Sequence, residues 1–316
     1  MGVPRASGQP DYGPAGTVNF VPEIYSGKLV EKFYKSTVFG EIATTEYEGE
    51  IVGYGAQIKI RTVPDVTVSD YIVGAGLTPQ YPTRNSVTLS IDQAKSFNVG
   101  LNTVDSRQSD LDLSDLFANE GSIQLKIAAD AELLEVIPSQ VAAENTGATA
   151  GNDSGNINIG SLTAPLLVGK EASSGVQGVV DFVTLCGQVL DEQSVPDEGR
   201  WIVLPPWAIN LIKRSDLKIA SLAGDGVSIL RNGKVGVIDR FTIYMSRNVF
   251  KTTSPATSWS VMFGHSAGLA FAAQIVEAQM IDNPNDFGYL VRGLMVFGFK
   301  VIEENYVGCA FVAPAP

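Results

Sequence analysis

One run of the sequence has the residue types of a catalytic motif. Gly264-His265-Ser266-Ala267-Gly268 matches the pattern G-x-S-x-G, in which the serine is the nucleophile of a hydrolase. That serine needs a separate histidine as its base, and His265 is the only histidine in the chain. Adjacent side chains on a strand point to opposite faces, so His265 is poorly placed to reach Ser266. We favour a turn of small residues beside a buried strand, and a serine hydrolase built on Ser266 stays open as an alternative.

Residue types that hold metals or cofactors are few and scattered. A structural zinc site of Cys and His type needs four ligands, whereas Cys186 and Cys309 are far apart and no C-x-x-C occurs. Gly53-Tyr54-Gly55 lacks the third glycine of a dinucleotide-binding loop, and Gly169-Lys170 is not followed by the Ser or Thr of a phosphate-binding loop. We predict no catalytic, cofactor-binding or metal site, and we interpret both cysteines as small core residues.

Composition excludes several protein classes. Of the 316 residues, 45% are hydrophobic and 18% charged, which is enough apolar material for a buried core and argues against wholesale disorder. The net charge of −12 does not suit a protein that grips nucleic acid over its whole surface. No apolar stretch approaches the roughly 18 residues of a membrane helix, and the first residues lack the apolar region of a secretion signal. We therefore expect no membrane partner and a cytoplasmic, reducing origin.

Periodicity predicts a mixed α+β fold. A Gly- and Pro-rich arm comes first, and Pro22 then opens a helical pattern that we expect to be interrupted near Gly40. Gln57–Val63 and Ser86–Asp92 alternate between polar and apolar residues, which predicts two strands of an extended hairpin with a Gly/Pro tip; Val66–Ser69 is expected to resume the first strand.

A long helix is the strongest single prediction, with Ser114 as its N-cap and Pro138 at its end. Its acids outnumber its one base, Lys126, and predict a strongly acidic face; they are Asp112, Asp115, Glu120, Asp130, Glu132 and Glu135. A Gly/Asn/Ser-rich stretch over 142–174 then predicts a linker. The rest alternates, with helices predicted over Val176–Leu190 and Trp207–Arg214 and strands at Trp201–Leu204 and Phe241–Met245.

Taken together, these stretches resemble the major capsid proteins of tailed bacteriophages, which share the Hong Kong phage fold. Gly55–Arg61, Pro64–Asp70 and Ile91–Phe97 resemble that family's extended E-loop and its return strand, and the long helix resembles its spine helix. Residues 233–248 resemble a stretch of the axial domain. Many relatives carry Gly directly before Phe241, whereas this chain has Arg240, so the local turn is expected to differ.

The resemblance implies a division of the whole chain. We expect an N-terminal arm at 1–21, an N-terminal helix region at 22–44, the E-loop with its flanking strands at 45–101, the spine helix with peripheral domain at 102–141, a linker or loop at 142–174, a mainly axial domain at 175–280, and strands returning to the peripheral domain at 281–316.

The function implied is that of a shell protein. Hexamers and pentamers of this one chain would form an icosahedral shell around double-stranded DNA, which the wall contacts weakly and without sequence specificity. A separate scaffolding protein and a portal are expected as partners, the assembly site is the host cytoplasm, and the mature location is the virion capsid. An encapsulin-type compartment shell is the alternative with the same fold, and a β-rich adhesion or tail protein would not account for the long acidic helix.

Contacts between subunits are expected on the E-loop. The charged residues Lys59, Arg61, Asp70 and Lys95 alternate with apolar neighbours and are predicted to form ion pairs between subunits, with Tyr71 beside them. Some relatives link a Lys covalently to an Asn of a neighbouring subunit. No acceptor or catalytic acid for such a link stands out here, so we predict that this chain does not form one.

Overall fold

The computed structural model describes residues 37–47, 57–62, 86–103, 113–215, 236–284 and 287–315, with short pieces of 64–81. The side chains of Leu113 and 274–277 are outside this description. The predicted arm at 1–21 and most of the helix region at 22–44 also lie outside the described residues. What is described of that region includes the short helix α1 (Phe39–Ile42). Residues 37–38 directly before it are not helical, in line with the expected interruption near Gly40.

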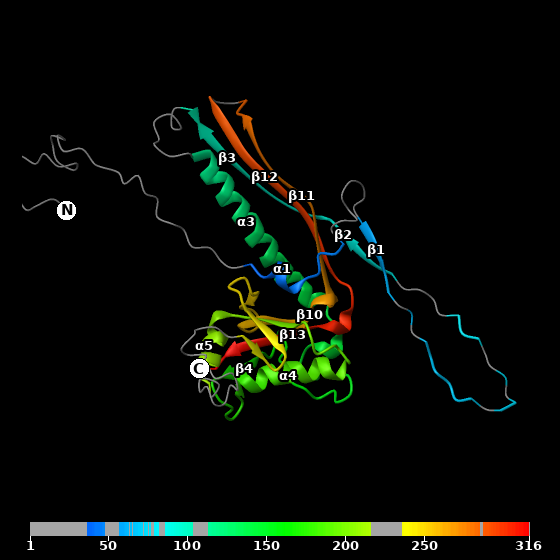
Figure 1. Cartoon of the computed structure of the whole chain (residues 1–316). Coiled ribbons are helices and arrows are strands. Elements are labelled where there is room, and N and C mark those ends of the chain that lie inside the picture. Colours follow the sequence, from blue (N-terminus) through cyan, green and yellow to red (C-terminus); the bar gives the residue numbers. More distant parts are fainter. Residues whose placement is uncertain are drawn as a thin grey trace, which may run out of the picture.

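The lower part of the molecule consists of an eight-stranded sheet and the helices that pack on it (Figure 1). We call this part the sheet body. In spatial order the strands are β5 (Gln177–Gly178), β4 (Leu166–Gly169), β13 (Val307–Pro314), β10 (Ser258–His265), β6 (Arg200–Leu204), β8 (Phe241–Met245) and β7 (Val237–Ile238), with β9 (Lys251–Thr252) paired to β10. Its helices are α4 (Val179–Glu192) and α5 (Pro206–Arg214).

Both faces of this sheet are covered, which explains why all five residues of β6 are buried. Ile202 and Leu204 face the core shared with α4 and α5, whereas Trp201 and Val203 face a second core shared with the long helix above. Strands buried on both faces are continuous apolar runs rather than alternating ones. This is why the short run Trp201–Leu204 was recognisable as a buried strand.

The upper part is an elongated layer of one helix on one sheet, which we call the helix–sheet arm (Figure 1). The antiparallel sheet has the order β11 (Leu269–Asp282), β12 (Gly288–Val301), β3 (Gln93–Asn102). The helix is α3 (Leu113–Val136), which continues as a 3-10 turn over Ile137–Gln140 that contains Pro138. The long helix and its end are therefore confirmed, while Ser114 lies inside α3 rather than at its cap.

A hairpin projects from the side of the helix–sheet arm, and we call residues 57–90 the projecting hairpin (Figure 1). Its antiparallel strands are β1 (Gln57–Arg61) and β2 (Ser86–Ser90). Ile60 and Leu89 anchor it, because they are buried against Ala270 and Ala272 of β11. Val66–Ser69, predicted as a further piece of strand, has no regular structure.

Two stretches lie elsewhere in the fold than the expected division suggests. Residues 142–174, expected as a linker or loop, are mostly irregular but belong to the sheet body, because β4 pairs with β13 and Ile157 and Ile159 are buried in its core. The glycines that suggested a linker make tight turns instead; Gly147, Gly151 and Gly160 all have positive φ. The C-terminal division also differs. Most of β11 lies within 175–280, the range expected for the axial domain, but it belongs to the helix–sheet arm. β13 lies within 281–316, the range expected to return to the peripheral domain, but it lies in the middle of the sheet body.

Glycine sets the spacing between α3 and its sheet at one point. A Cβ at Gly121 of α3 would lie 2.4 Å from the Phe97 ring, and a Cβ at Gly293 of β12 would lie 2.3 Å from the same ring. The ring is therefore held between two glycines and has little room to move.

We expect Gly121→Ala to lower the free energy of unfolding by about 1–2 kcal/mol, because it overpacks Phe97. Without the ring, the same change should stabilise the helix by about 1 kcal/mol, the ordinary gain of Ala over Gly. Urea unfolding of Gly121→Ala in the native and Phe97→Ala backgrounds checks this reversal of sign. Stabilisation by Gly121→Ala in the native background would show that Phe97 does not fill the space.

Candidate functional site

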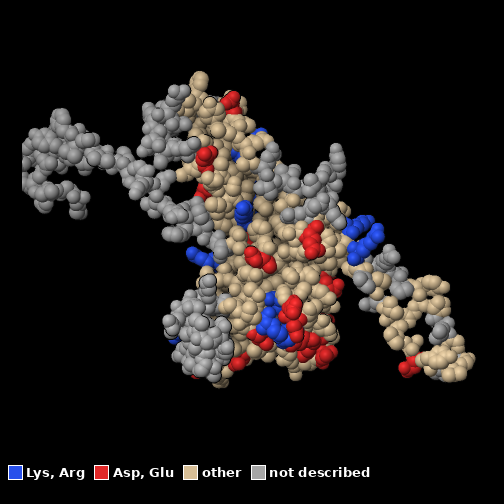
Figure 2. All heavy atoms as spheres, in the orientation of Figure 1, with Lys and Arg blue, Asp and Glu red and all other residues tan. Residues whose placement is uncertain are grey.

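The loop at the end of the projecting hairpin carries large apolar side chains that face solvent. Val68 is 92% exposed, Tyr81 87% and Val73 85%. Val66 and Tyr71 are also exposed. Large apolar side chains exposed together on one loop are typical of sites where proteins bind one another. Figure 2 shows the loop reaching away from the body, with uncharged side chains over most of it and Lys and Arg gathered near its base.

A side chain holds the two limbs of this loop at a fixed distance. The backbone N–H of Thr67 donates to Oε1 of Gln80 at 3.1 Å, and Nε2 of Gln80 donates to the carbonyl of Thr67 at 2.7 Å. The amide of Gln80 thus makes the pair of hydrogen bonds that a facing strand would make. The apolar side chains are therefore presented on a partly ordered loop, which lowers the entropy lost when a partner covers them.

The structure separates the residues predicted as inter-subunit contacts. Lys59 and Arg61 lie on β1 with exposed side chains, and Asp70 and Tyr71 lie farther out on the loop, also exposed. Among the described residues, Lys59, Arg61 and Asp70 have no ion-pair partner within the chain. Lys95 is different: it lies on β3 of the helix–sheet arm, and its Nζ is 2.7 Å from Oε2 of Glu132 on α3.

The exposed valines of this loop were missed by the sequence prediction. Their alternation over Val66–Ser69 was interpreted as a strand with one buried face. The signal that could have found them is the Pro and Gly content on both sides, which indicates a loop without a core beneath it.

The motif around Ser266 does not have the geometry of a hydrolase. There the nucleophile stands on a turn from a strand to a helix. Here Ser266 lies in a 3-10 turn between two strands, β10 and β11. Nδ1 of His265 accepts a hydrogen bond from the backbone N–H of Ala267 at 3.1 Å. The favoured interpretation, a turn of small residues beside a buried strand, is confirmed.

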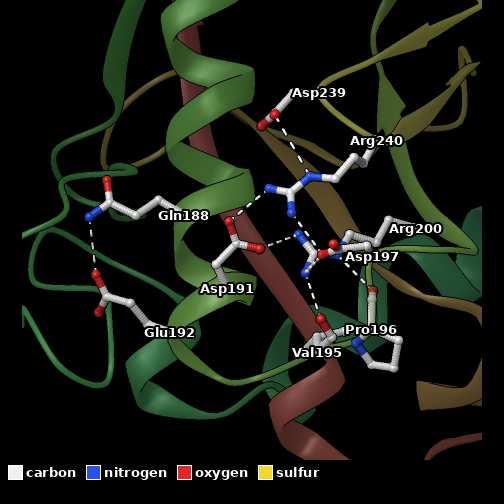
Figure 3. A network of polar contacts seen from close by, with 9 residues as sticks. All are labelled: Gln188, Asp191, Glu192, Val195, Pro196, Asp197, Arg200, Asp239 and Arg240. Carbon is white, nitrogen blue, oxygen red and sulfur yellow. Dashed lines mark hydrogen bonds and ion pairs between the residues drawn. The ribbon is translucent and has the colours of Figure 1, made fainter.

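Two arginines and two aspartates form a polar cluster on the sheet body (Figure 3). Arg200 of β6 is buried, and its Nη1 is 2.7 Å from Oδ1 of Asp191 at the end of α4. Its guanidinium also donates to the carbonyls of Val195 at 2.6 Å and Pro196 at 2.9 Å. These contacts tie α4, the following loop and β6 together.

Arg240 contacts the same two aspartates from the surface. Its Nη2 is 2.7 Å from Oδ2 of Asp191, and its Nη1 is 2.7 Å from Oδ1 of Asp197. Burial would raise the pKa of Asp191, but hydrogen bonds and charge from Arg240 and Arg200 outweigh it and place the pKa below its ordinary value.

The β7–β8 turn explains how Arg240 takes the place of a glycine. Asp239 and Arg240 have φ of +47° and +66°, the left-handed pair that a two-residue hairpin turn requires. The backbone is therefore one that glycine favours, and the ion pairs of Arg240 offset the strain of a side chain there.

Two buried polar residues hold separate segments together. Asn145 is fully buried, and its Nδ2 donates to the carbonyls of Asn305 at 2.8 Å and Val307 at 3.1 Å. Asp130 of α3 is also fully buried, and its Oδ1 accepts from the backbone N–H groups of Val38 at 2.8 Å and Phe39 at 3.0 Å. Burial raises the pKa of Asp130, against hydrogen bonds that lower it.

These contacts correct the predicted acidic face of the long helix. Asp130 lies inside the protein, and Glu132 is paired with Lys95. The acids of α3 therefore do not form one continuous exposed surface.

Both cysteines are buried and unpaired, as predicted for core residues. Burial raises the pKa of the Cys186 and Cys309 thiols, which makes them poor nucleophiles. Among the described residues, no three His, Cys, Asp or Glu side chains come together as metal ligands. No helix in this part of the chain is both long and apolar enough to cross a bilayer.

Several solved structures of phage proteins have the same architecture as this chain. A structure from Mycobacterium phage Che8 aligns with a TM-score of 0.75 and 23% identity over 92% of this chain and 97% of its own. The capsid of cyanophage P-SCSP1u aligns with a TM-score of 0.71 and 15% identity over 98% of both chains. The mature capsid of bacteriophage PhiM1 aligns with a TM-score of 0.64 and 13% identity over 96% of this chain and 95% of that one.

At the level of sequence, no protein-family model and no curated protein matches the chain. The likeness is therefore one of three-dimensional structure, and it extends over nearly the whole length of the chain. The chain has the fold of phage capsid proteins, and the predicted α+β capsid fold is confirmed.

Proposed function

We propose that this chain is a major capsid protein that assembles into the icosahedral shell of a tailed phage. The observation that carries the proposal is the projecting hairpin, whose apolar loop has no partner surface among the described residues of its own chain. Its anchor on β11 and its exposed Val68, Val73 and Tyr81 suit a segment that is covered only when copies associate. The phage capsid fold supports the same role. No observation favours the compartment-shell or hydrolase alternatives.

The proposed role is structural rather than catalytic. The shell would consist of hexamers and pentamers of this chain, assembled in the host cytoplasm with a scaffolding protein and a portal, and it would become part of the virion. The net charge of −12 supports weak contact with packaged DNA that is independent of sequence. We propose the projecting hairpin as the E-loop, with Lys59, Arg61, Asp70 and Tyr71 among its contacts to other subunits. Lys95 is not included, because Glu132 already pairs with it.

The loop is tested by adding charge to it. We expect the double variant Val68→Asp, Tyr71→Asp to give no closed shells, because two carboxylates would have to be buried against a neighbouring subunit. The variant should still fold with unchanged circular dichroism and melting temperature, since these side chains are 92% and 69% exposed. Sedimentation and electron microscopy of the purified protein measure the outcome.

The matched control adds two carboxylates at Ala172 and Ser174, which are exposed on the sheet body. This control should assemble like the native chain. Shells of normal size from the Val68→Asp, Tyr71→Asp variant would rule out the loop as an assembly contact. Loss of assembly in both variants would show that added charge alone is responsible.

A further inference from the structure

One fully buried carboxylate lies where the two parts of the molecule meet. Asp130 is in the C-terminal part of α3, which reaches the sheet body with α1 beside it (Figure 1). Its Oδ1 accepts from the backbone N–H groups of Val38 at 2.8 Å and Phe39 at 3.0 Å, where α1 begins. Its Oδ2 accepts from Nδ2 of Asn248 at 2.7 Å. One side chain of the helix–sheet arm therefore binds both the segment that enters α1 and the loop after β8.

The backbone of Asn248 is fixed to the sheet body. Its N–H donates to Oγ of Ser246 at 3.0 Å, and the N–H of Ser246 donates to the carbonyl of Leu204 on β6 at 3.1 Å. Asn248 is only 6% exposed, and Val249 after it is buried in the core shared with α3. The side-chain amide can still reverse its two ends by rotating about the Cβ–Cγ bond, which moves no backbone atom.

The carbonyl end of this amide is not used for hydrogen bonding. Oδ1 of Asn248 is buried and has no hydrogen-bond partner among the described residues. Rotation by half a turn would place Oδ1 where Nδ2 now contacts Asp130, so that the amide accepts a hydrogen bond instead of donating one. In either orientation one end of the amide contacts Asp130 and the other does not. Rotation therefore reverses the hydrogen bond and leaves as many of these atoms paired as before.

The protonation state of Asp130 decides which orientation fits. An ionised carboxylate needs a donor opposite Oδ2, whereas a carboxylic acid with its proton on Oδ2 needs an acceptor there. Without rotation, two donors would face each other across the 2.7 Å between Oδ2 and Nδ2. After rotation an O–H···O hydrogen bond fits the same distance, because such bonds are ordinarily about 2.7–2.8 Å long. The pair can therefore hold either protonation state with both backbones in place.

Burial favours the protonated state. It raises the pKa of Asp130 above the ordinary value of 3.8, and the hydrogen bonds from Asn248, Val38 and Phe39 oppose this rise without cancelling it. No charged side chain among the described residues contributes to this shift in the pKa. The titratable groups on the neighbouring elements are Glu41 of α1 with Tyr244 of β8, Lys95 of β3 with Glu132 of α3, Lys126 of α3, Arg247 of the loop, His265 of β10 and Lys300 of β12.

We infer that Asp130 and Asn248 form a proton switch at the junction of α3, the sheet body and the segment entering α1. One proton from solvent binds Oδ2 of Asp130, the amide of Asn248 rotates, and the new O–H donates to Oδ1 of Asn248. Return of the proton to solvent reverses both changes.

The switch changes how firmly the segment entering α1 is held. In the protonated state Val38 and Phe39 donate to a neutral carbonyl oxygen instead of a carboxylate. Hydrogen bonds to an ionised acceptor are about twice as strong as neutral ones, so this segment is held less firmly in acid. All groups involved belong to one chain, so the switch does not depend on shell assembly.

Magic-angle-spinning NMR of the sedimented full-length protein tests the switch, whether or not the chain is assembled. With ¹³C-labelled aspartate and ¹⁵N-labelled asparagine, we expect the carboxyl of Asp130 to titrate above pH 3.8. The side-chain ¹⁵N signal of Asn248 should shift with the same midpoint. A signal of Asn248 that stays fixed while Asp130 titrates would overturn the switch, as would a carboxyl of Asp130 that stays ionised down to pH 3.8.

The variant Asp130→Asn reproduces the neutral state at every pH. The introduced amide can donate to Oδ1 of Asn248, so at neutral pH the Asn248 signal should already lie where the native chain brings it only in acid. An Asn248 signal equal to that of the native chain at neutral pH would contradict the reversal of the hydrogen bond. If Asp130→Asn does not fold, Asn248→Ala identifies the Asn248 signal by its loss, and the titration of the native chain decides.

Urea unfolding gives an independent measurement with a defined sign. The pKa of Asp130 is higher in the folded chain than in the unfolded chain, so its contribution to stability is greatest below pH 3.8 and is lost as the pH rises through the folded value. The native chain should therefore lose stability relative to Asp130→Asn between about pH 4 and pH 7. A difference that is constant over this range, or that changes in the opposite direction, would overturn the inference and leave the proposal of shell assembly untouched.

Discussion

Replacing Asn145 by aspartate is expected to destabilise the protein by about 3–5 kcal/mol, the cost of a buried charge without a partner. The native amide donates to the carbonyls of Asn305 and Val307, and its Oδ1 accepts from Nε2 of Gln193 at 3.1 Å. A carboxylate has no N–H to donate and would place negative charge against those carbonyl oxygens. Thermal unfolding followed by circular dichroism should show a fall in melting temperature on the order of 10 °C.

The chain contains a matched control for this change. Asn152→Asp makes the same chemical substitution in an exposed turn of the same region, and we expect it to alter stability by less than about 0.5 kcal/mol. Asn145→Ala should be intermediate, because it leaves the two carbonyls unpaired but adds no charge. Equal melting temperatures for the two aspartate variants would contradict the account of Asn145 as the residue that pins the segment before β13.

Arg200→Met is expected to cost about 3–5 kcal/mol of unfolding free energy, because it removes a guanidinium that donates to two carbonyls and pairs with Asp191 and Asp197. Methionine can fill much of the space of the arginine stem, so most of the loss should come from the polar contacts rather than from a cavity. The carbonyls of Val195 and Pro196 would be left without their donor. Urea unfolding measures the difference.

Arg240→Met is the comparison that isolates burial. Both arginines contact Asp191 and Asp197, but the side chain of Arg240 is 38% exposed whereas that of Arg200 is 0% exposed. We expect Arg240→Met to cost less than about 1 kcal/mol, the usual range for exposed ion pairs. A loss as large as that of Arg200→Met would mean that the surface contacts, not the buried ones, hold this cluster together.

The local sequence pattern was sufficient to predict elements whose buried residues form a continuous run or recur at helical spacing. α4 is one case, because Val179, Val183, Cys186 and Leu190 recur at helical spacing and are all fully buried. α5 is another, since Pro206 occupies its first turn and Lys213 and Arg214 its last. β8 was predicted with its observed bounds.

Local pattern failed where packing depends on distant residues. The buried stripe of α3 includes Gly121, Leu125, Ala129 and Leu133, and two of these are small residues that add little to a hydrophobic pattern. Asp130 lies on the buried side, although its type predicts exposure, because its carboxylate accepts three hydrogen bonds from other segments. β11 and β13 belong to different sheets because they pair with different strands. This pairing cannot be predicted from a short stretch of sequence.

The sequence and the structure direct attention to different residues of the hairpin. The resemblance to capsid proteins predicts contacts at its charged residues, whereas the structure shows that Val68, Val73 and Tyr81 are largely exposed apolar side chains. Lys95 was grouped with the hairpin because Ile91–Phe97 resembles the return strand of the E-loop, whereas its pairing with Glu132 is set by the three-dimensional structure.

The central claim is that copies of this chain close into a shell through the projecting hairpin. Cryo-electron microscopy of the purified native chain, expressed alone and together with a scaffolding protein, tests it most directly. We predict closed icosahedral particles in which Val68 and Tyr81 of one subunit lie against a neighbouring subunit. A folded monomer in both preparations, or closed particles whose loops extend into solvent without a contact, would contradict the claim.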